Sequence, residues 1–282
     1  MNTRVLTSEI TLPTAPTDTV LACARFVFFL LFTVFIVLFI SLLRVLFIGT
    51  APVRRVYYRI MARVLGFELK VKGRQVKDRP MLIVCNHISY LDIVIVGAVV
   101  KGAFVARGDM ADWPFFGLMA KAGRTVFIDR KRSSTNVARD AIQNRLDEGS
   151  CLIMFPESTS GDGNHMLPFK SALFTVAEKT VKGKPITVQP MSIAYTRLNG
   201  LPIGVGWRAF FAWYGDMTLG PHLWQALKMG RTTVEIEFHD PVTAADMGGR
   251  KALAAHCHKV TSESFSRLLS GRSKALTPIS AP

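Results

Sequence analysis

A histidine and an aspartate, His87 and Asp92, are the side chains of this 282-residue chain best suited to proton transfer. They follow an apolar run at residues 81–85 that is typical of a buried strand, and a second apolar run comes after them. An imidazole accepts a proton near neutral pH, and a carboxylate on its other nitrogen fixes the tautomer and stabilises the imidazolium. The pair therefore predicts a positioned general base, with Asn86 beside it.

The spacing of this pair restricts where its members can lie. On a continuous α-helix, positions five residues apart point about 140° away from each other. We therefore expect His87 in a turn between strand and helix, and Asp92 in the first turn of that helix. The segment Ser89-Tyr90-Leu91-Asp92 also fits a capping box, in which Asp92 would only close the start of the helix. The residues themselves leave both roles open.

Three later segments also place polar residues directly after, or inside, an apolar run. Residues 123–132 end in a row of cations suited to an anionic group at the end of a strand, although a solvated loop has the same composition. Residues 155–163, with proline and clustered small side chains, predict a tight loop that approaches a ligand closely. Residues 188–193 predict a strand interrupted by Pro190, suited to a sheet edge or to a bulge that lines the substrate.

These segments lie in a region where short apolar runs alternate with helical stretches. The pattern predicts strands at residues 68–71, 81–85, 103–106, 125–128, 151–155, 187–194 and 234–238. It predicts helices at residues 91–100, 115–122, 136–148, 171–181 and 244–269. Such alternation indicates an α/β fold, a layered αβα arrangement around a mixed, largely parallel central sheet.

An uncharged apolar run at residues 26–43 precedes this domain and is bounded by Arg25 and Arg44. As a helix it would be about 27 Å long, close to the thickness of the hydrocarbon core of a bilayer. A cleaved signal peptide would have a shorter apolar region, so we predict an N-terminal membrane helix that either spans or re-enters. The predicted organisation is a tail at 1–22, an anchor with a basic interfacial helix at 23–66, a catalytic domain at 67–270 and a tail at 271–282.

The net charge of +15 indicates an acidic partner. The basic residues are scattered and form no nucleic-acid-binding motif, so we expect anionic membrane lipids rather than nucleic acid, besides an acidic carrier protein or a phosphate-bearing substrate. Arginines concentrated after the apolar run place the domain in the cytoplasm by the positive-inside rule. The four cysteines have no metal-binding spacing, and neither a metal nor another cofactor is expected.

Taken in order, the four segments resemble the glycerolipid acyltransferase family, whose best-known members acylate 1-acylglycerol-3-phosphate to phosphatidate. The family's first block, Asn-His-x4-Asp, is matched in full by Asn86, His87 and Asp92. Its second, a glycine followed by Phe-Ile-x-Arg, is matched by Gly123, Phe127, Ile128 and Arg130. Its third, Phe-Pro-Glu-Gly-Thr-Arg, is matched only in part, by Phe155, Pro156, Glu157 and Thr159. Its fourth is matched in outline by Val188 and Pro190.

Two departures from the third block bear on the acceptor. Ser158 stands for the family's glycine and Ser160 for its arginine, which in the family is thought to contact the phosphate of the acceptor. Without that bidentate cation, either Arg130, Lys131 or Lys170 substitutes for it, or the acceptor carries no such phosphate. The stretch from Glu157 to Ala172 also looks like a bacterial branch of the family that acylates lyso-ornithine lipid.

The resemblance implies acyl transfer without a covalent intermediate. His87, oriented by Asp92, would remove the proton of an acceptor hydroxyl, which attacks a thioester of acyl carrier protein or coenzyme A. The implied substrate-binding residues are Asn86, Gly123, Phe127, Arg130, Lys131, Glu157, Thr159, Ser160, Lys170 and Pro190. Of these, Glu157 and Thr159 are expected to shape the acceptor loop rather than to transfer protons.

The expected reaction is the formation of phosphatidate from 1-acyl-sn-glycerol-3-phosphate, narrowly ahead of the acylation of lyso-ornithine lipid. The expected place is the cytoplasmic side of a bacterial inner membrane. A non-catalytic lipid-binding protein with the same fold is the alternative from another class. The oligomeric state stays open.

Overall fold

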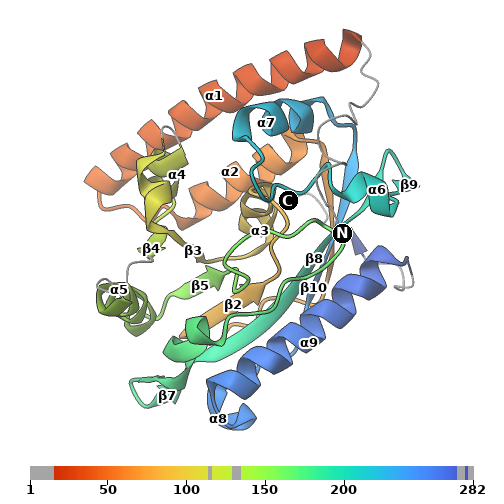
Figure 1. Ribbon diagram of the computed structural model, residues 1–282. Helices are drawn as coiled ribbons and strands as arrows, with labels where there is room; N and C mark the ends of the chain where they lie inside the picture. The colour runs from red at the N-terminus through yellow and green to blue at the C-terminus, as the bar shows by residue number, and fades with distance from the viewer. Residues whose placement is uncertain (1–15, 114–115, 129–134, 272–276, 279–282) are drawn as a thin grey trace.

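The computed structural model describes residues 16–113, 116–128, 135–271 and 277–278, and these residues form helices on both sides of a nine-stranded sheet (Figure 1). In spatial order the strands are β11 (Thr277–Pro278), β1 (Phe67–Lys72), β10 (Thr232–Phe238), β8 (Thr187–Leu198), β2 (Met81–Cys85), β5 (Cys151–Met154), β3 (Ala103–Arg107) and β4 (Val126–Ile128). The short β9 (Leu201–Pro202) pairs with β8. From β8 to β4 the strands run parallel, whereas β10 is antiparallel to β8. The predicted layered fold with a mixed, largely parallel sheet is confirmed.

Side chains of the central strands alternate between two hydrophobic clusters, one on each face of the sheet. In β2, Met81, Ile83 and Cys85 belong to one cluster, and Leu82 and Val84 belong to the other. Successive residues of a strand point to opposite faces, so both faces need a cover of helices. The first face is covered by α2 (Ala51–Val64), α3 (Leu91–Val99) and α7 (Leu219–Lys228). The second is covered by α5 (Thr135–Asp147), the 3-10 helix η4 (Ser171–Glu178) and the first half of α9 (Arg250–Leu269).

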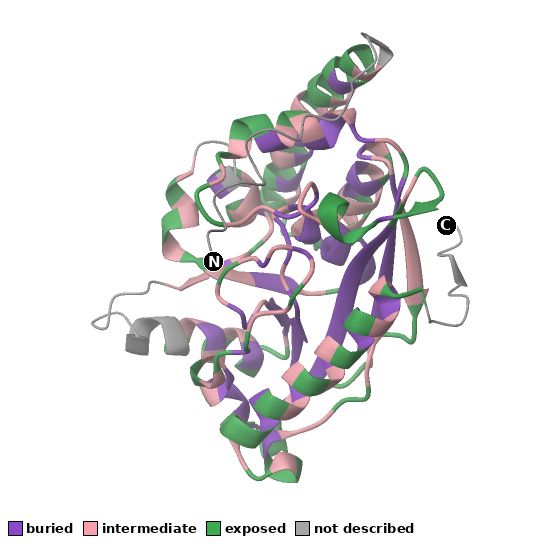
Figure 2. Cartoon of the chain, turned by 45° about the vertical axis from the view of Figure 1, so that its right-hand side comes forward, coloured by how far each residue is buried: buried purple, intermediate pink, exposed green. Residues whose placement is uncertain are grey.

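The long apolar helix α1 (Pro16–Val45) lies along the domain, and its outer side is exposed (Figure 2). Within its span Asp18–Val45, an 18-residue window has a mean hydropathy of 3.1, and only 17% of that window is buried. By length and composition this is the one helix among the described residues that could cross a bilayer. Arg25 near its start donates to the carbonyl oxygens of Leu227 and Met229, at 2.9 and 2.7 Å. Arg44 near its end donates to Ala122 O at 2.8 Å. Both ends of the helix are therefore bonded to the domain.

The predicted basic interfacial helix is present as α2, but three of its arginines bind the protein itself. Arg59 and Arg55 donate to Ala98 O and Val99 O at the end of α3, at 3.3 and 3.4 Å. Arg54 donates to the carbonyl oxygen of Gly123, just after α4 (Phe116–Ala122). The carboxyl ends of helices carry a partial negative charge, which attracts cations. These arginines therefore fix α2 to the domain.

Several predicted boundaries differ from the structure. Helix α1 begins at Pro16, so the predicted tail boundary at residue 23 lies inside it. The stretch predicted as a helix at 171–181 is a 3-10 helix followed by the strands β6 (Thr180–Val181) and β7 (Lys184–Pro185). The predicted helix at 244–269 is divided into α8 (Ala244–Met247) and α9, because Gly248 and Gly249 adopt φ angles of 78° and 113° that no α-helix contains.

Strand β8 lies in the middle of the sheet, so of the two places predicted for Pro190 the sheet edge is wrong. Pro190 O accepts a hydrogen bond from His239 N at 3.0 Å, on the side of the strand where β10 has just ended. A residue's N–H and C=O face the same side of a strand, so the proline lacks the donor that His239 O would normally receive. The side-chain amide of Gln189 supplies it, with Nε2 3.0 Å from that oxygen.

Candidate active site

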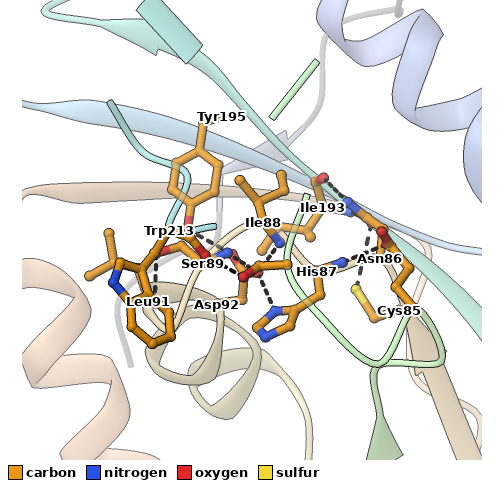
Figure 3. Close-up of polar contacts among 12 residues, drawn as sticks. Cys85, Asn86, His87, Ile88, Ser89, Leu91, Asp92, Ile193, Tyr195 and Trp213 are labelled. Atoms are coloured by element: carbon orange, nitrogen blue, oxygen red, sulfur yellow. Dashed lines mark hydrogen bonds and ion pairs between the residues drawn. The ribbon is translucent and has the colours of Figure 1, made fainter. Parts of the chain in front are cut away.

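His87 and Asp92 meet across the turn that joins β2 to α3 (Figure 3). Nδ1 of the imidazole lies 2.9 Å from Oδ2 of the carboxylate. The histidine follows the last residue of the strand by two positions, and the aspartate is the second residue of the helix. The pair converges as its spacing requires, because the chain turns between its members.

Four donors converge on the fully buried carboxylate of Asp92. Besides the imidazole, the backbone N–H groups of Ile88 and Ser89 donate to Oδ2, at 2.7 and 2.9 Å. The hydroxyl of Tyr195 donates to Oδ1 at 2.8 Å. A carboxylate without water needs such partners, and these satisfy both oxygens. The N-cap of α3 is Tyr90 and has no side-chain capping bond, so the contact of Asp92 with Ser89 N holds the turn before the helix while the same carboxylate orients the imidazole.

The imidazole of His87 is held on one side and open on the other. Its ring stacks on Phe155, with centroids 4.2 Å apart and planes 16° apart. Its side chain is 20% exposed, and within the described part of the chain Nε2 has no hydrogen-bond partner. When Nδ1 donates its proton to Asp92, Nε2 carries the lone pair and faces outward. The arrangement can remove a proton from a hydroxyl placed against Nε2.

Tyr195, which the sequence analysis missed, holds the far oxygen of Asp92. It lies in β8, is 3% exposed and comes 103 residues after its partner. Burial, together with the negative charge of Asp92, raises the pKa of the Tyr195 hydroxyl well above its ordinary value, so the group stays a donor. Its only signal in the sequence is a tyrosine in an apolar strand, one that gains meaning only once β8 is known to lie beside β2.

The third block is joined to the backbone of His87 from two directions. The carboxylate of Glu157, 2% exposed, accepts from His87 N at Oε1 and from Leu167 N at Oε2, both at 2.8 Å. Gly161 N donates to His87 O at 2.9 Å. Burial raises the pKa of Glu157 to about 7, against the two backbone hydrogen bonds that lower it, and the charge of Asp92 raises it further. No base role follows, because both oxygens already have donors.

The two residues that depart from the third block have distinct places. Ser158, which stands for the family's glycine, adopts a φ of 66°, in the left-handed region that favours glycine. The hydroxyl of Ser160 donates to Trp213 O, and Trp213 N in turn donates to Ile88 O at 3.0 Å. Ser160 is therefore engaged by the segment that covers the catalytic turn. Thr159 is exposed.

Comparison with known proteins supports the resemblance to an acyltransferase family. The family model described as Acyltransferase matches residues 68–194. The lyso-ornithine lipid O-acyltransferase of Brucella abortus is 41% identical over 202 residues, which are 70% of this chain and 76% of that protein. The chain belongs to the acyltransferase family. It is an acyltransferase, and the predicted resemblance is confirmed.

Further relatives of this acyltransferase carry two different names. A lyso-ornithine lipid O-acyltransferase of Rhizobium meliloti is 35% identical and covers 78% of the chain and 77% of that protein. A 1-acyl-sn-glycerol-3-phosphate acyltransferase of Neisseria gonorrhoeae is 30% identical and covers 67% of the chain and 70% of that protein. The crystal structure of a 1-acyl-sn-glycerophosphate acyltransferase from Thermotoga maritima has the same fold, with a TM-score of 0.68 at 20% identity over 93% of this chain and 98% of that one.

The other predicted substrate-binding residues of the acyltransferase do not all gather at His87. Asn86 is buried, and its amide exchanges two hydrogen bonds with the backbone of Ile193, at 2.9 and 3.0 Å, which joins the end of β2 to β8. Gly123 precedes β4 and Phe127 lies within it, while His87 follows the carboxyl end of the parallel strand β2. Gly123 therefore lies toward the amino-terminal ends of the parallel strands, whereas His87 lies at their carboxyl ends.

The cations predicted to bind the acceptor are only partly visible. Lys170 is exposed, and its backbone N–H donates to Pro156 O at 2.9 Å. It therefore lies at the base of the loop of residues 155–170, which begins with the third block and is called the third-block loop below. Arg130 and Lys131 lie outside the described residues. Pro190, in β8, pairs with Val84 two residues before the catalytic turn begins.

Remaining histidines and acids of the acyltransferase do not build a metal site in the described part of the chain, where no group of three or more such ligands gathers. Buried His222 pairs through Nδ1 with the Tyr90 hydroxyl at 2.9 Å, and burial lowers the pKa of its imidazole. His165 pairs with Asp162 on an exposed loop, at 3.2 Å. Neither arrangement offers an open nitrogen beside a buried carboxylate.

Proposed function

We propose that this acyltransferase moves an acyl chain from a thioester of acyl carrier protein or coenzyme A to the hydroxyl of lyso-ornithine lipid, which gives ornithine lipid. The observation that carries the choice of acceptor is the contact of Ser160 with Trp213 O. The position that holds a phosphate-binding arginine in the family is here a short neutral side chain, bonded to a carbonyl of the protein itself. Such a site suits an acceptor without a phosphate monoester.

The identities of the relatives support this order of acceptors. Proteins named for lyso-ornithine lipid are 41% and 35% identical to the chain, whereas one named for 1-acyl-sn-glycerol-3-phosphate is 30% identical. The phosphate-bearing acceptor 1-acyl-sn-glycerol-3-phosphate, which the sequence alone favoured narrowly, therefore ranks second to lyso-ornithine lipid. Exposed Lys170 at the base of the third-block loop is the observation in its favour, because a lysine can bind phosphate as a point charge.

The chemistry would proceed through the open nitrogen of His87. Nε2 takes the proton of the acceptor hydroxyl, and the hydroxyl oxygen attacks the carbonyl carbon of the thioester. Asp92 stabilises the imidazolium that forms, since its Oδ2 lies 2.9 Å from Nδ1. The tetrahedral intermediate then breaks its carbon–sulfur bond, and the leaving thiolate receives the proton from His87. General-base catalysis of this kind contributes about 10²–10⁴-fold to the rate.

A competition between acceptors tests this proposal. Purified protein in detergent is given lyso-ornithine lipid and 1-acyl-sn-glycerol-3-phosphate together with a labelled acyl-carrier thioester, and the two products are separated and counted. We expect ornithine lipid to form at least about tenfold faster, and Ser160→Arg to shift the ratio toward phosphatidate. His87→Ala gives the background. Product from the phosphate-bearing acceptor alone would overturn the choice of acceptor.

We further propose that the catalytic domain lies on the cytoplasmic side of a bacterial inner membrane, held there by α1. The apolar outer side of this helix and the arginines after it support that orientation. An exposed cysteine placed at Lys251 tests it. In a Cys23→Ser background, which removes the exposed native cysteine, a membrane-impermeant maleimide should label Lys251→Cys in inverted vesicles and not in intact spheroplasts. The opposite pattern would contradict the orientation.

A further inference from the structure

We infer that Glu157 is a positioning residue whose ionised carboxylate joins the backbone of His87 to the loop of residues 161–170, and so sets the direction of the catalytic imidazole. The inference rests on the proposed function, because it concerns the same catalytic turn. It assigns to this glutamate no contact with substrate. Its role is instead to hold the turn and the loop in register with each other.

The contacts of Glu157 point inward on both sides. Its Oε1 accepts from His87 N and its Oε2 from Leu167 N, each at 2.8 Å, and the residue is 2% exposed. A third hydrogen bond closes the ring, since Gly161 N donates to His87 O at 2.9 Å. The loop is thus bonded to the N–H and to the C=O of His87. Displacement of the loop would turn the peptide planes on either side of the imidazole.

Only the ionised form of the side chain can serve both donors well. A carboxylate accepts at each oxygen, whereas a carboxylic acid has one hydroxyl oxygen, which is a poor acceptor and needs a partner for its own proton. Protonation therefore weakens one of the two contacts, either at His87 or at Leu167. A glutamine imitates this state permanently, because its NH2 group would face one of the N–H donors.

The surroundings of Glu157 bring its titration close to neutral pH. Cys85 from β2 and Asp92 from α3 lie within electrostatic range, and the imidazole of His87 belongs to the residue it holds. On the loop, Asp162 and His165 pair with each other. Burial raises the pKa of Glu157 from its ordinary 4.5 to about 7, and the negative charge of Asp92 adds to this rise.

The sign of this shift links folding and catalysis in opposite directions. Because the pKa is raised in the folded protein, the contribution of Glu157 to stability is complete below pH 4.5 and is lost as the pH rises through about 7. The ionised form that holds His87 is therefore the one that folding disfavours. We expect the turn to be well ordered only above about pH 7.

The test combines a pH–rate profile with amide hydrogen exchange, on the full-length protein in detergent with whichever lyso-acceptor reacts. In the wild type, kcat should lose an additional factor of about ten as the pH falls through about 7, because protonation of Glu157 weakens one of its two contacts. In Glu157→Gln, kcat at pH 8 should be about tenfold lower with KM little changed, and the additional step near pH 7 should be absent. The matched control is Asp162→Asn, which also replaces a carboxylate by its amide on the same loop. This variant should keep the pH–rate profile of the wild type.

Amide exchange needs no substrate, so it separates this inference from the proposed function. In Glu157→Gln, exchange at His87 N and Leu167 N should quicken at least about tenfold, and in the wild type it should quicken below pH 7 after correction for the intrinsic rate. Wild-type kcat and exchange in Glu157→Gln would overturn the inference. So would a raised KM with unchanged kcat and exchange, which indicates a contact with substrate. Should the variant not fold, slow exchange at His87 N in the wild type at pH 6 would be equally decisive against it.

Discussion

Two histidine–aspartate pairs in this chain look alike in a hydrogen-bond diagram and differ in everything around them. His87 and Asp92 lie 2.9 Å apart in the turn after β2, and His165 and Asp162 lie 3.2 Å apart in the third-block loop. Both carboxylates also accept from two backbone N–H groups. The side chains of the first pair are 20% and 0% exposed, and those of the second are 83% and 37% exposed.

The difference shows what turns such a pair into a base. Asp92 has no water to satisfy it, so each of its oxygens is bonded to the protein, one of them to the buried hydroxyl of Tyr195. The imidazole of His87 is fixed by Phe155 on its face and by Asp92 at one nitrogen. On the exposed loop, solvent screens the pair, and the imidazole of His165 is 83% exposed. Enclosure, rather than pairing, distinguishes the histidine that we propose as the base.

Removal of the catalytic imidazole is the change with the largest expected effect. We expect His87→Ala to reduce kcat at least about 100-fold, within the range of general-base catalysis, and to leave membrane binding intact. Initial rates with a labelled thioester and a vesicle flotation assay measure the two properties. More than about a tenth of wild-type activity in this variant would rule out His87 as the base.

Substitution of the buried carboxylate should come next. Asp92→Asn keeps the shape, but its NH2 group must face a donor, either the Tyr195 hydroxyl or Nδ1 of the imidazole. If it faces Nδ1, the proton moves to Nε2 and the base is lost. We expect kcat to fall about 100-fold with KM for the acceptor little changed. Steady-state kinetics at pH 8 check this, and a change in KM alone would contradict it.

Loss of the hydroxyl that supports Asp92 should have an intermediate effect. Tyr195→Phe leaves Oδ1 without its donor, and a hydrogen bond to a charged group contributes about 1.5–3 kcal/mol. We expect part of this to appear as a threefold to tenfold lower kcat, and part as a lower melting temperature. Equal kcat in the variant and the wild type would show that the backbone N–H groups hold Asp92 without help.

Substitution in the exposed pair of His165 and Asp162 should have the smallest effect on kcat and stability. His165→Ala removes an ion pair that solvent screens, and such pairs contribute about 0–1 kcal/mol. We expect kcat and melting temperature within about twofold and about 2 °C of the wild type. A decrease in kcat as large as that of Tyr195→Phe would contradict the proposed difference between the two pairs. It would indicate that His165 contacts the substrate.

Much of the architecture followed from local patterns. The apolar runs predicted β2 and β5 closely, because buried strands need apolar side chains on both faces. The spacing of His87 and Asp92 required a turn between them, and that turn is present. Predictions failed where long-range neighbours decide. Pro190 lies in a central strand because Gln189 satisfies the carbonyl opposite, and three arginines of α2 bind the ends of helices that come later in the chain.

By itself, the sequence determined the residues proposed as the base, the order of the blocks and the layered fold, since these depend on residue types and on spacings of a few positions. Only the tertiary structure decided that Tyr195 supports Asp92 across 103 residues, that Glu157 is saturated by two backbone donors, and that Ser160 is bonded to Trp213 O. Such contacts join segments far apart in the chain, and a hydrogen bond between them exists only once the sheet has brought the segments together.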